Sequence, residues 1–221
     1  PGDNPVKPVL GLDYKKTTGN IHDPNWKITG NADYAKSLLE KAKTSCPDAY
    51  DRATNPAKGI TWDIANTATN QKASVLIIDA MKAAGFNIKF NFIPSGQYYS
   101  TVMNTAKQND ISSAGWGADW ANASTVIPEL FTKEGGFNLS QNWNDAAYPA
   151  FKKKSDATKV ETDRAKQAKG WQELSQYVMD QYWIIRPVFS KTQEVWGSKV
   201  GGVYYWEPQG NFGFGQMYVK N

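Results

Sequence analysis

The sequence of 221 residues has a single cysteine and a single histidine. Because Cys46 is the only cysteine, no disulfide can form within the chain, and a metal site built from several thiolates is excluded. A Ser/His/Asp or Cys/His catalytic arrangement would depend on His22 alone, and no Gly-x-Ser-x-Gly motif accompanies it. We therefore expect His22 to be a surface or interface residue without a catalytic role.

Long apolar runs are also missing. No stretch reaches the roughly 18 uninterrupted apolar residues that span a membrane. The chain begins with Pro-Gly-Asp-Asn-Pro, which has neither the charged nor the apolar region of a signal peptide. If the protein is exported, we expect its signal to have been removed or to lie outside this sequence.

Charge of one sign is not concentrated anywhere except at Lys152–Lys154, although basic residues outnumber acidic ones by 25 to 21. Nucleic-acid-binding surfaces normally gather basic residues on one face, so we expect no nucleic-acid partner. The carboxylates show neither EF-hand nor His-Glu-x-x-His spacing, and no P-loop is present, so we expect neither a metal nor a cofactor. A hydrolase whose paired carboxylates converge from distant loops remains open.

The hydrophobic pattern of the first half alternates between strand and helix, which is typical of βαβ units on a shared sheet. An amphipathic helix over residues 31–42 comes first. The pattern then predicts strands over 59–66, 87–93 and 110–114, and helices over 69–84 and 97–107. Gly85 is placed to end the first of these two helices. With 40% hydrophobic residues, the chain suits one large or two small globular domains.

The second half is predicted to be more helical. Helices are expected over 122–131, 148–157 and 160–181, and strand-like segments over 182–190 and 193–197. Residues 1–31 are predicted to be a connecting segment that needs a surface to lie against, and residues 46–56 a polar loop. Residues 197–221 are rich in glycine and aromatic residues and show only brief strand character.

The run Gly-Trp-Gly-Ala-Asp-Trp over residues 115–120 follows the third predicted strand directly. In open α/β sheets, ligands bind beyond the carboxyl ends of the strands, and glycine there lets the backbone approach a ligand closely. We expect Trp116 to contact a ligand. Asp119 has two readings that the residues alone leave open: it caps the following helix or closes a turn, or it binds a protonated amine in a partly dehydrated cleft.

Several segments together resemble the extracytoplasmic oligopeptide- and dipeptide-binding proteins of ABC importers, also called family 5 solute-binding proteins. In the first half these are Trp62-Asp-Ile-Ala-Asn, Met81-Lys-Ala-Ala-Gly-Phe-Asn-Ile-Lys-Phe, Ser95-Gly-Gln-Tyr-Tyr and Asp110-Ile-Ser-Ser-Ala-Gly-Trp-Gly-Ala-Asp-Trp. In the second half they are Tyr148-Pro-Ala-Phe, Trp171-Gln-Glu-Leu, Ile184-Ile-Arg-Pro-Val-Phe and Gly201 to Tyr218. The Gly-Trp-x-x-Asp element after a strand is the most specific of them.

This resemblance implies an α/β fold with a mixed sheet and flanking helices, the second lobe of a two-lobed periplasmic-binding-protein-like fold. Residues 1–30 would be an inter-lobe connecting segment, 31–189 the ligand-binding lobe, and 190–221 a C-terminal segment that packs on the missing N-terminal lobe. The implied function is non-catalytic: the protein binds an oligopeptide-like solute and delivers it to a membrane ABC permease. The implied location is extracytoplasmic, in the periplasm or lipid-anchored to the outer face of the cytoplasmic membrane.

The resemblance also implies the ligand-binding residues. Asp119 matches the acid that holds the α-amino group of a peptide, and Gly115, Trp116 and Gly117 match the wall beside it. Gln71 and Asn66 match polar or basic ligand-contacting positions near the first strand and helix.

Dipeptide-binding relatives carry Arg where this chain has Asn66, and some oligopeptide-binding relatives carry Arg where it has Ser113. The absence of both favours a longer peptide over a dipeptide. An oligosaccharide or another solute remains an alternative ligand.

Overall fold

The computed structural model describes residues 3–19, 23, 25, 30–185, 193–206 and 211–220. The chain divides into two compact units, here called unit 1 (Pro1–Ile21 with Gly115–Asn221) and unit 2 (His22–Ala114). These limits differ from the boundaries expected after residues 30 and 189. His22, expected to have no catalytic role, lies outside the described residues.

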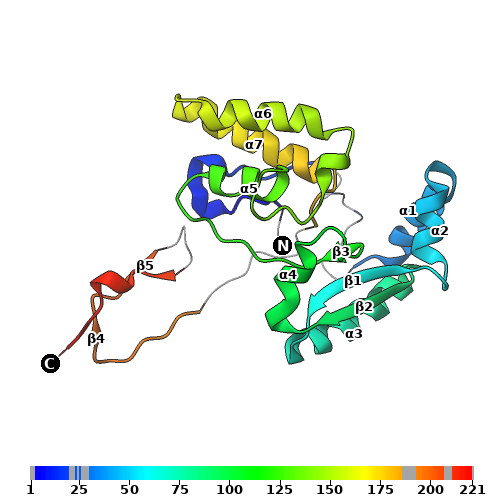
Figure 1. The fold of residues 1–221 in the computed structure, drawn as a ribbon, viewed down its shortest axis with the longest axis horizontal. Coiled ribbons are helices and arrows are strands. Elements are labelled where there is room, and N and C mark those ends of the chain that lie inside the picture. Colours follow the sequence, from blue (N-terminus) through cyan, green and yellow to red (C-terminus); the bar gives the residue numbers. More distant parts are fainter. Residues whose placement is uncertain are drawn as a thin grey trace. The chain divides into compact units, whose positions relative to one another are not determined.

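Unit 2 is built on a parallel sheet of three strands in the order β2-β1-β3. The strands are β1 (Ile60–Ala65), β2 (Ile88–Ile93) and β3 (Ile111–Ser112), and β1 pairs along its whole length with β2. Helix α3 (Ala68–Ala83) connects β1 to β2 and packs against β2 (Figure 1). The predicted α/β alternation is therefore confirmed.

The end of α3 follows the local sequence closely. Gly85 has a φ of 93°, and its N–H bonds the carbonyl of Lys82, while the N–H of Phe86 bonds the carbonyl of Met81. These two bonds form a Schellman motif, in which glycine tolerates the left-handed conformation that other residues rarely adopt. The prediction that Gly85 ends this helix is confirmed.

Two elements after β2 are shorter than predicted. The turn η3 (Ser95–Gln97) leads into α4 (Tyr98–Val102), which ends where the Asn104 side chain accepts a hydrogen bond from the N–H of Ala106. Such side-chain-to-backbone bonds favour a turn over continued helix. Strand β3 stops at Ser112 because the N–H of Ser113 donates to the Tyr98 hydroxyl, at 2.8 Å, instead of to a neighbouring strand.

The remaining helices of unit 2 are α1 (Ala32–Ser45) and α2 (Pro47–Thr54). The Asn31 side chain caps α1 by accepting a hydrogen bond from the N–H of Tyr34. The prediction of a polar loop over residues 46–56 was wrong. Pro47 was taken as part of a loop, but it occupies the first helical position, where its fixed φ suits the helix and its missing N–H costs nothing.

Up to residue 180, unit 1 is helical. Its elements there are η1 (Pro8–Asp13), η4 (Ala123–Thr125), α5 (Ile127–Phe131), η5 (Asn142–Asn144), α6 (Tyr148–Val160) and α7 (Arg164–Asp180). Helices α6 and α7 lie side by side (Figure 1). Trp171, Phe151 and Ile127 are fully buried in its core, and so is Val6 from the segment predicted to need a surface to lie against.

The boundary between the last two helices is later than predicted. Residues 161–163 separate α6 from α7, and the Asp163 side chain caps α7 by accepting hydrogen bonds from the N–H groups of Ala165 and Lys166. Val160 therefore ends α6 instead of beginning α7.

None of the helices in the described part of the chain has the length and apolar character needed to cross a bilayer.

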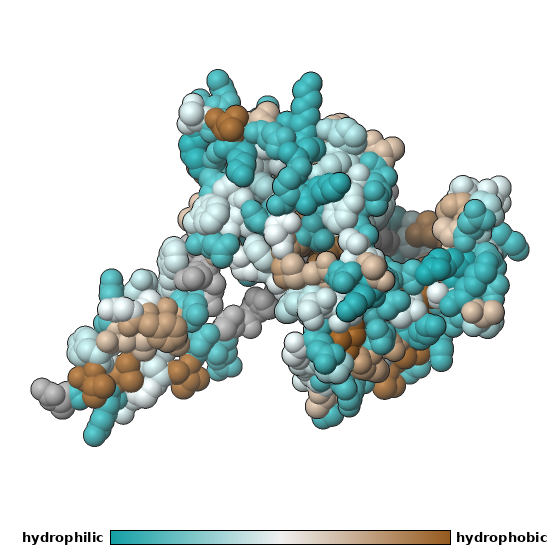
Figure 2. All heavy atoms as spheres, in the orientation of Figure 1, coloured by the Kyte–Doolittle hydropathy of each residue, from teal (hydrophilic) through white to brown (hydrophobic). Residues whose placement is uncertain are grey.

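The C-terminal segment, here residues 193–206 and 211–220, contains short antiparallel pairs. Strand β4 (Val200–Gly201) pairs with β7 (Tyr218–Val219), and β5 (Tyr205–Trp206) pairs with β6 (Asn211–Phe212). The turn η6 (Phe214–Gln216) lies between β6 and β7 in the sequence. The predicted strands over 182–190 and 193–197 are not formed at the described positions, and residues 186–190 lie outside them. Hydrophobic side chains lie on the surface of this segment (Figure 2), among them Val195, Trp196, Phe214 and Val219.

Candidate ligand-binding site

The first group of candidate residues lies in the loop between β3 and η4. The Thr125 hydroxyl donates a hydrogen bond to Oδ2 of Asp119 at 2.9 Å and accepts one from the N–H of Asp119 at 3.1 Å. Thr125 is fully buried, whereas Asp119 is exposed. Among the described residues, none donates a hydrogen bond to Oδ1 of Asp119, so this oxygen is available to a partner from solution.

Asp119 does not cap the following helical turn. The Asn122 side chain does so, accepting a hydrogen bond from the N–H of Ser124 at 2.9 Å. The two bonds between Asp119 and Thr125 instead close the loop across six residues. The prediction that Asp119 caps the helix was therefore wrong. Asp119 does close a turn, but this uses only its N–H and Oδ2 and leaves Oδ1 out.

Trp116 is half-buried and combines packing with exposure. Its indole N–H donates to the carbonyl of Thr125 at 2.8 Å, and its ring lies 4.9 Å from the ring of Phe137, centroid to centroid. The side chain also packs against the core of unit 1. Because the N–H is already bound, the indole offers a ligand only apolar surface and the faces of its ring.

Gly115 and Gly117 flank this tryptophan and are both exposed. A Cβ added to Gly115 would meet no atom within 4 Å, so the space beside it is open. The described glycines with positive φ are at other positions, so neither residue is required by backbone conformation. At Gly115, the missing side chain leaves room for a ligand.

A buried carboxylate, paired with a partly exposed arginine, holds the turn that carries Thr125. Asp13 is 0% exposed; its Oδ2 accepts a hydrogen bond from the N–H of Ala123 at 2.7 Å, and its Oδ1 accepts one from Nη1 of Arg164 at 2.6 Å. Sequence reasoning missed both Thr125 and Asp13. No periodic signal marks either residue, and Arg164 is 151 positions away from its partner.

The second group of candidate residues lies in unit 2, just after β1. Nε2 of Gln71 donates to Oδ1 of Asn66 at 2.7 Å, so these two predicted residues are in contact, and both are exposed. Asn66 is fixed further by its backbone N–H, which donates to the carbonyl of Ile93 at 2.7 Å. Four candidate residues thus belong to unit 1 and two to unit 2.

Beneath this edge of the sheet, polar groups are buried and bonded. The Tyr98 hydroxyl donates to the carbonyl of Ser113 and lies 3.2 Å from the carbonyl of Asp63, and burial raises the pKa of Tyr98 to about 12. The Asp63 side chain is fully buried and accepts hydrogen bonds from the amides of Asn91 and Asn109 and from the N–H of Asn109. These groups fix the strand ends and leave no acceptor for a ligand on Asp63.

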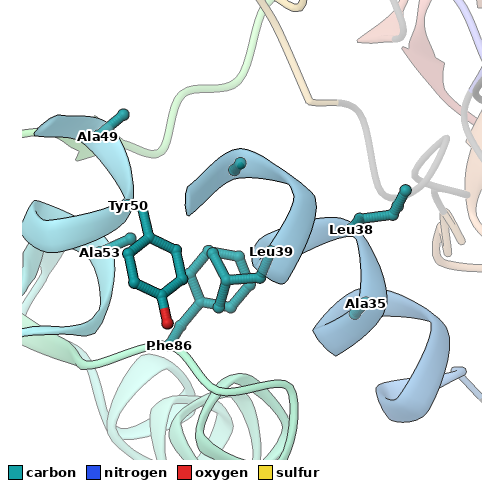
Figure 3. A pocket seen from close by; sticks show the side chains of 8 residues that line it. Ala35, Leu38, Leu39, Ala49, Tyr50, Ala53 and Phe86 are labelled. Atoms are coloured by element: carbon teal, nitrogen blue, oxygen red, sulfur yellow. The ribbon is translucent and has the colours of Figure 1, made fainter. Parts of the chain in front are cut away.

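An apolar groove of about 400 Å³ lies elsewhere in unit 2, between α1 and α2 (Figure 3). It is lined by Ala35, Leu38, Leu39, Ala42, Ala49, Tyr50, Ala53 and Phe86. The Tyr50 hydroxyl already donates to Glu40 at 3.0 Å. The groove therefore offers nothing that would bind the charged ends of a peptide.

Across the described residues, no group of three or more His, Cys, Asp or Glu side chains is placed to hold a metal ion.

The sequence matches no protein-family model and no curated protein. Among solved structures, it is similar to Bacillus subtilis AppA, an oligopeptide-binding protein in complex with a nonapeptide, with a TM-score of 0.66 and 16% identity over 100% of this chain and 42% of that one. Haemophilus influenzae OppA in complex with RPPGFSPFR gives a TM-score of 0.63 and 18% identity, over 86% and 35%. The Escherichia coli murein tripeptide binding protein MppA gives 0.57 and 16%, over 84% and 35%.

The chain has the fold of part of an oligopeptide-binding protein. It spans between 35% and 42% of the length of these three proteins. The fold expected from the resemblance is therefore confirmed. The roles of the individual site residues stay predictions.

Proposed function

We propose that this chain is the second lobe of an extracytoplasmic solute-binding protein and that it binds an oligopeptide-like solute for import. Two similar structures hold peptides, RPPGFSPFR in one and a nonapeptide in the other. In the proposed protein, a first lobe supplies the other wall of the cleft, and closure of the two lobes is the signal that an ABC permease reads. The protein would lie in the periplasm or be lipid-anchored outside the cytoplasmic membrane, and it would have no enzymatic activity.

One observation carries the peptide assignment: Asp119 is anchored through Oδ2 and has Oδ1 available, and the same Thr125 that anchors it also binds the half-buried indole of Trp116. A carboxylate next to apolar surface suits a protonated amine, because charge-assisted hydrogen bonds strengthen where water is reduced. The α-amino group of a peptide is such an amine. The exposed Gly115 and Gly117 would leave room for the peptide. Asn66 and Gln71, in unit 2, stay predicted ligand contacts.

The C-terminal segment fits the same proposal. Its exposed aromatic and aliphatic side chains, including Trp196 at 54% and Phe214 at 63% exposure, form more apolar surface than such a small segment needs for its own packing. We assign this surface to contact with the first lobe, as the expected role of residues 190–221 implies. Residues 1–30 would connect the lobes, with Val6 and Leu10 anchored in the core of unit 1.

The test uses the full-length protein and a test peptide, which is the most abundant peptide that co-purifies with it, identified by mass spectrometry and then synthesised. Asp119→Asn keeps the side-chain shape and removes the charge. It should weaken binding at least tenfold by calorimetry, since removing one member of a desolvated charge pair typically costs about 2 to 5 kcal/mol. The melting temperature should barely change.

The matched control is the same peptide with an acetylated amino terminus. Acetylation should weaken binding to the wild type and have little further effect on the variant. If no peptide co-purifies, or if acetylation and Asp119→Asn act independently, the peptide-amine assignment is wrong.

An oligosaccharide is the second candidate ligand, because Trp116 and Phe137 form an aromatic pair that could stack against a sugar ring. Mass spectrometry of the co-purifying solute separates the two. A hydrolase with distant paired carboxylates is the alternative from another class, and turnover of a labelled peptide would reveal it.

A further inference from the structure

We propose that Thr125 is the positioning residue of the candidate site: it fixes the Asp119 carboxylate and the Trp116 ring at the same time, so that a peptide amine meets a pre-arranged acceptor. This inference rests on the proposed function. It adds a residue that touches no peptide and yet sets the affinity for one.

The contacts of Thr125 reach both site residues. Its hydroxyl donates to Oδ2 of Asp119 at 2.9 Å and accepts from the N–H of Asp119 at 3.1 Å, while its carbonyl accepts from the indole N–H of Trp116 at 2.8 Å. A hydroxyl has a single hydrogen, and the backbone N–H already occupies one of its lone pairs. The hydrogen is therefore directed at Oδ2, which leaves Oδ1 as the oxygen for the ligand.

Thr125 is itself held by its turn. Its N–H donates to the carbonyl of Asn122 at 3.2 Å, and the Asn122 side chain bonds the Gln167 side chain on α7 at 2.9 Å. Two residues earlier in the turn, the N–H of Ala123 is bound by the buried carboxylate of Asp13. Rigidity in the core of unit 1 thus extends through η4 to an exposed carboxylate.

The physical consequence is pre-organisation. An exposed aspartate side chain that is free to rotate must be ordered when it binds, whereas one held at Oδ2 has already lost that freedom. Loss of the Thr125 hydroxyl should therefore weaken peptide binding without unfolding the protein, because Asp119 is exposed and water can replace the lost bond.

The test compares Thr125→Val with Thr132→Val in the full-length protein. Both threonines are buried in unit 1, but the Thr132 hydroxyl donates to the carbonyl of Pro128 at 2.7 Å and bonds neither site residue. Thr125→Val should weaken binding of the test peptide about threefold to tenfold, and Thr132→Val should leave it unchanged. Thr125→Ser, which keeps the hydroxyl, should bind like the wild type, and Thr125→Ala should behave like Thr125→Val if the valine variant does not fold.

A double variant tests whether Thr125 affects peptide binding through Asp119. In the Asp119→Asn background, Thr125→Val should cause little further loss, because the charge that it positions is already gone. Equal binding by Thr125→Val and Thr132→Val, with Asp119→Asn still weak, would overturn the positioning role and leave the proposed function intact. Wild-type affinity in Asp119→Asn would contradict the proposed function and this inference together.

Discussion

Among the described residues, each unit contains one aspartate that is 0% exposed, Asp13 in unit 1 and Asp63 in unit 2, and the two are stabilised in different ways. In unit 1, Asp13 lies against the guanidinium of Arg164 and one backbone N–H. In unit 2, Asp63 accepts three hydrogen bonds from Asn91 and Asn109, and no cation of the described chain pairs with it. These two fully buried carboxylates are therefore stabilised by a cation in one case and by a full set of donors in the other.

Asp119 differs from both buried aspartates in how its carboxylate oxygens are bonded. Both oxygens of Asp13 and of Asp63 are occupied by groups of the chain, whereas Asp119 has one occupied oxygen and lies at the surface. Substitution of the buried aspartates should change stability, and substitution of Asp119 should change binding.

The largest effect is expected at Asp63. Asp63→Ala leaves two amide groups and one backbone N–H without their acceptor and removes volume at a fully buried position. The free energy of unfolding should fall by about 3 kcal/mol, measured by chemical denaturation, since each unsatisfied buried donor costs about 1 to 3 kcal/mol and the Asn side chains can partly turn to water. Asp79→Ala, at an exposed position on α3, is the control and should change stability by less than about 0.5 kcal/mol.

Hydrogen exchange locates the effect. Faster exchange in β1 and β2 of Asp63→Ala is expected, since these strands adjoin the lost bonds. Equal stability of Asp63→Ala and Asp79→Ala would show that the amide network does not stabilise the sheet.

An intermediate effect, dependent on pH, is expected from Tyr98 in the same unit. Burial raises the pKa of Tyr98 from 10.0 to about 12, so the folded state favours the neutral phenol. The associated stability is fully present below about pH 10, where the phenol is neutral in both states, and is lost as pH rises from 10 to about 12, because the unfolded chain ionises first. A shift of this size corresponds to about 2 kcal/mol at pH 12.

The measurement is the denaturation midpoint of wild type and Tyr98→Phe between pH 9 and pH 12. The difference in midpoint between wild type and Tyr98→Phe should shrink across this range. A constant difference for Tyr98→Phe would mean that ionisation of Tyr98 is not coupled to folding.

The sequence predicted best what depends on neighbours along the chain. Gly85 could be recognised as a helix terminator because the Schellman motif involves only residues within one turn. Asn66 and Gln71 were named only through the family resemblance, and the contact between their side chains was not predicted. The short helix α2 was missed because proline is ambiguous between a loop and the first turn of a helix.

What the sequence did not predict depends on distant contacts. Asp13 looked like an ordinary residue of a connecting segment, and only the approach of Arg164 from α7 gives it a role. Thr125 precedes an apolar run and carries no pattern that would connect it with Asp119 or Trp116. The candidate loop could be found from its glycines and tryptophans, but the residue that holds it could not.

The smallest change in the free energy of unfolding is expected for a substitution of Arg164. It tests whether Asp13 is stabilised by the charge of Arg164 or by the geometry of its hydrogen bonds. The Arg164 side chain is 42% exposed, so water can take part of its place, and Arg164→Gln should lower the free energy of unfolding by about 1 to 2 kcal/mol. This loss reflects a buried carboxylate left without its cation, since Ala123 still donates to Oδ2. Adding Asp13→Asn removes that charge, and the double variant should regain part of the lost stability, as measured by chemical denaturation. Because Asp63 has no cation to lose, unit 2 offers no equivalent of this recovery.

A double variant that is less stable than Arg164→Gln alone would show that Asp13 stabilises unit 1 through the geometry of its hydrogen bonds and not through its charge. Asp13 and Asp63 would then differ only in the number of hydrogen-bond donors around each carboxylate.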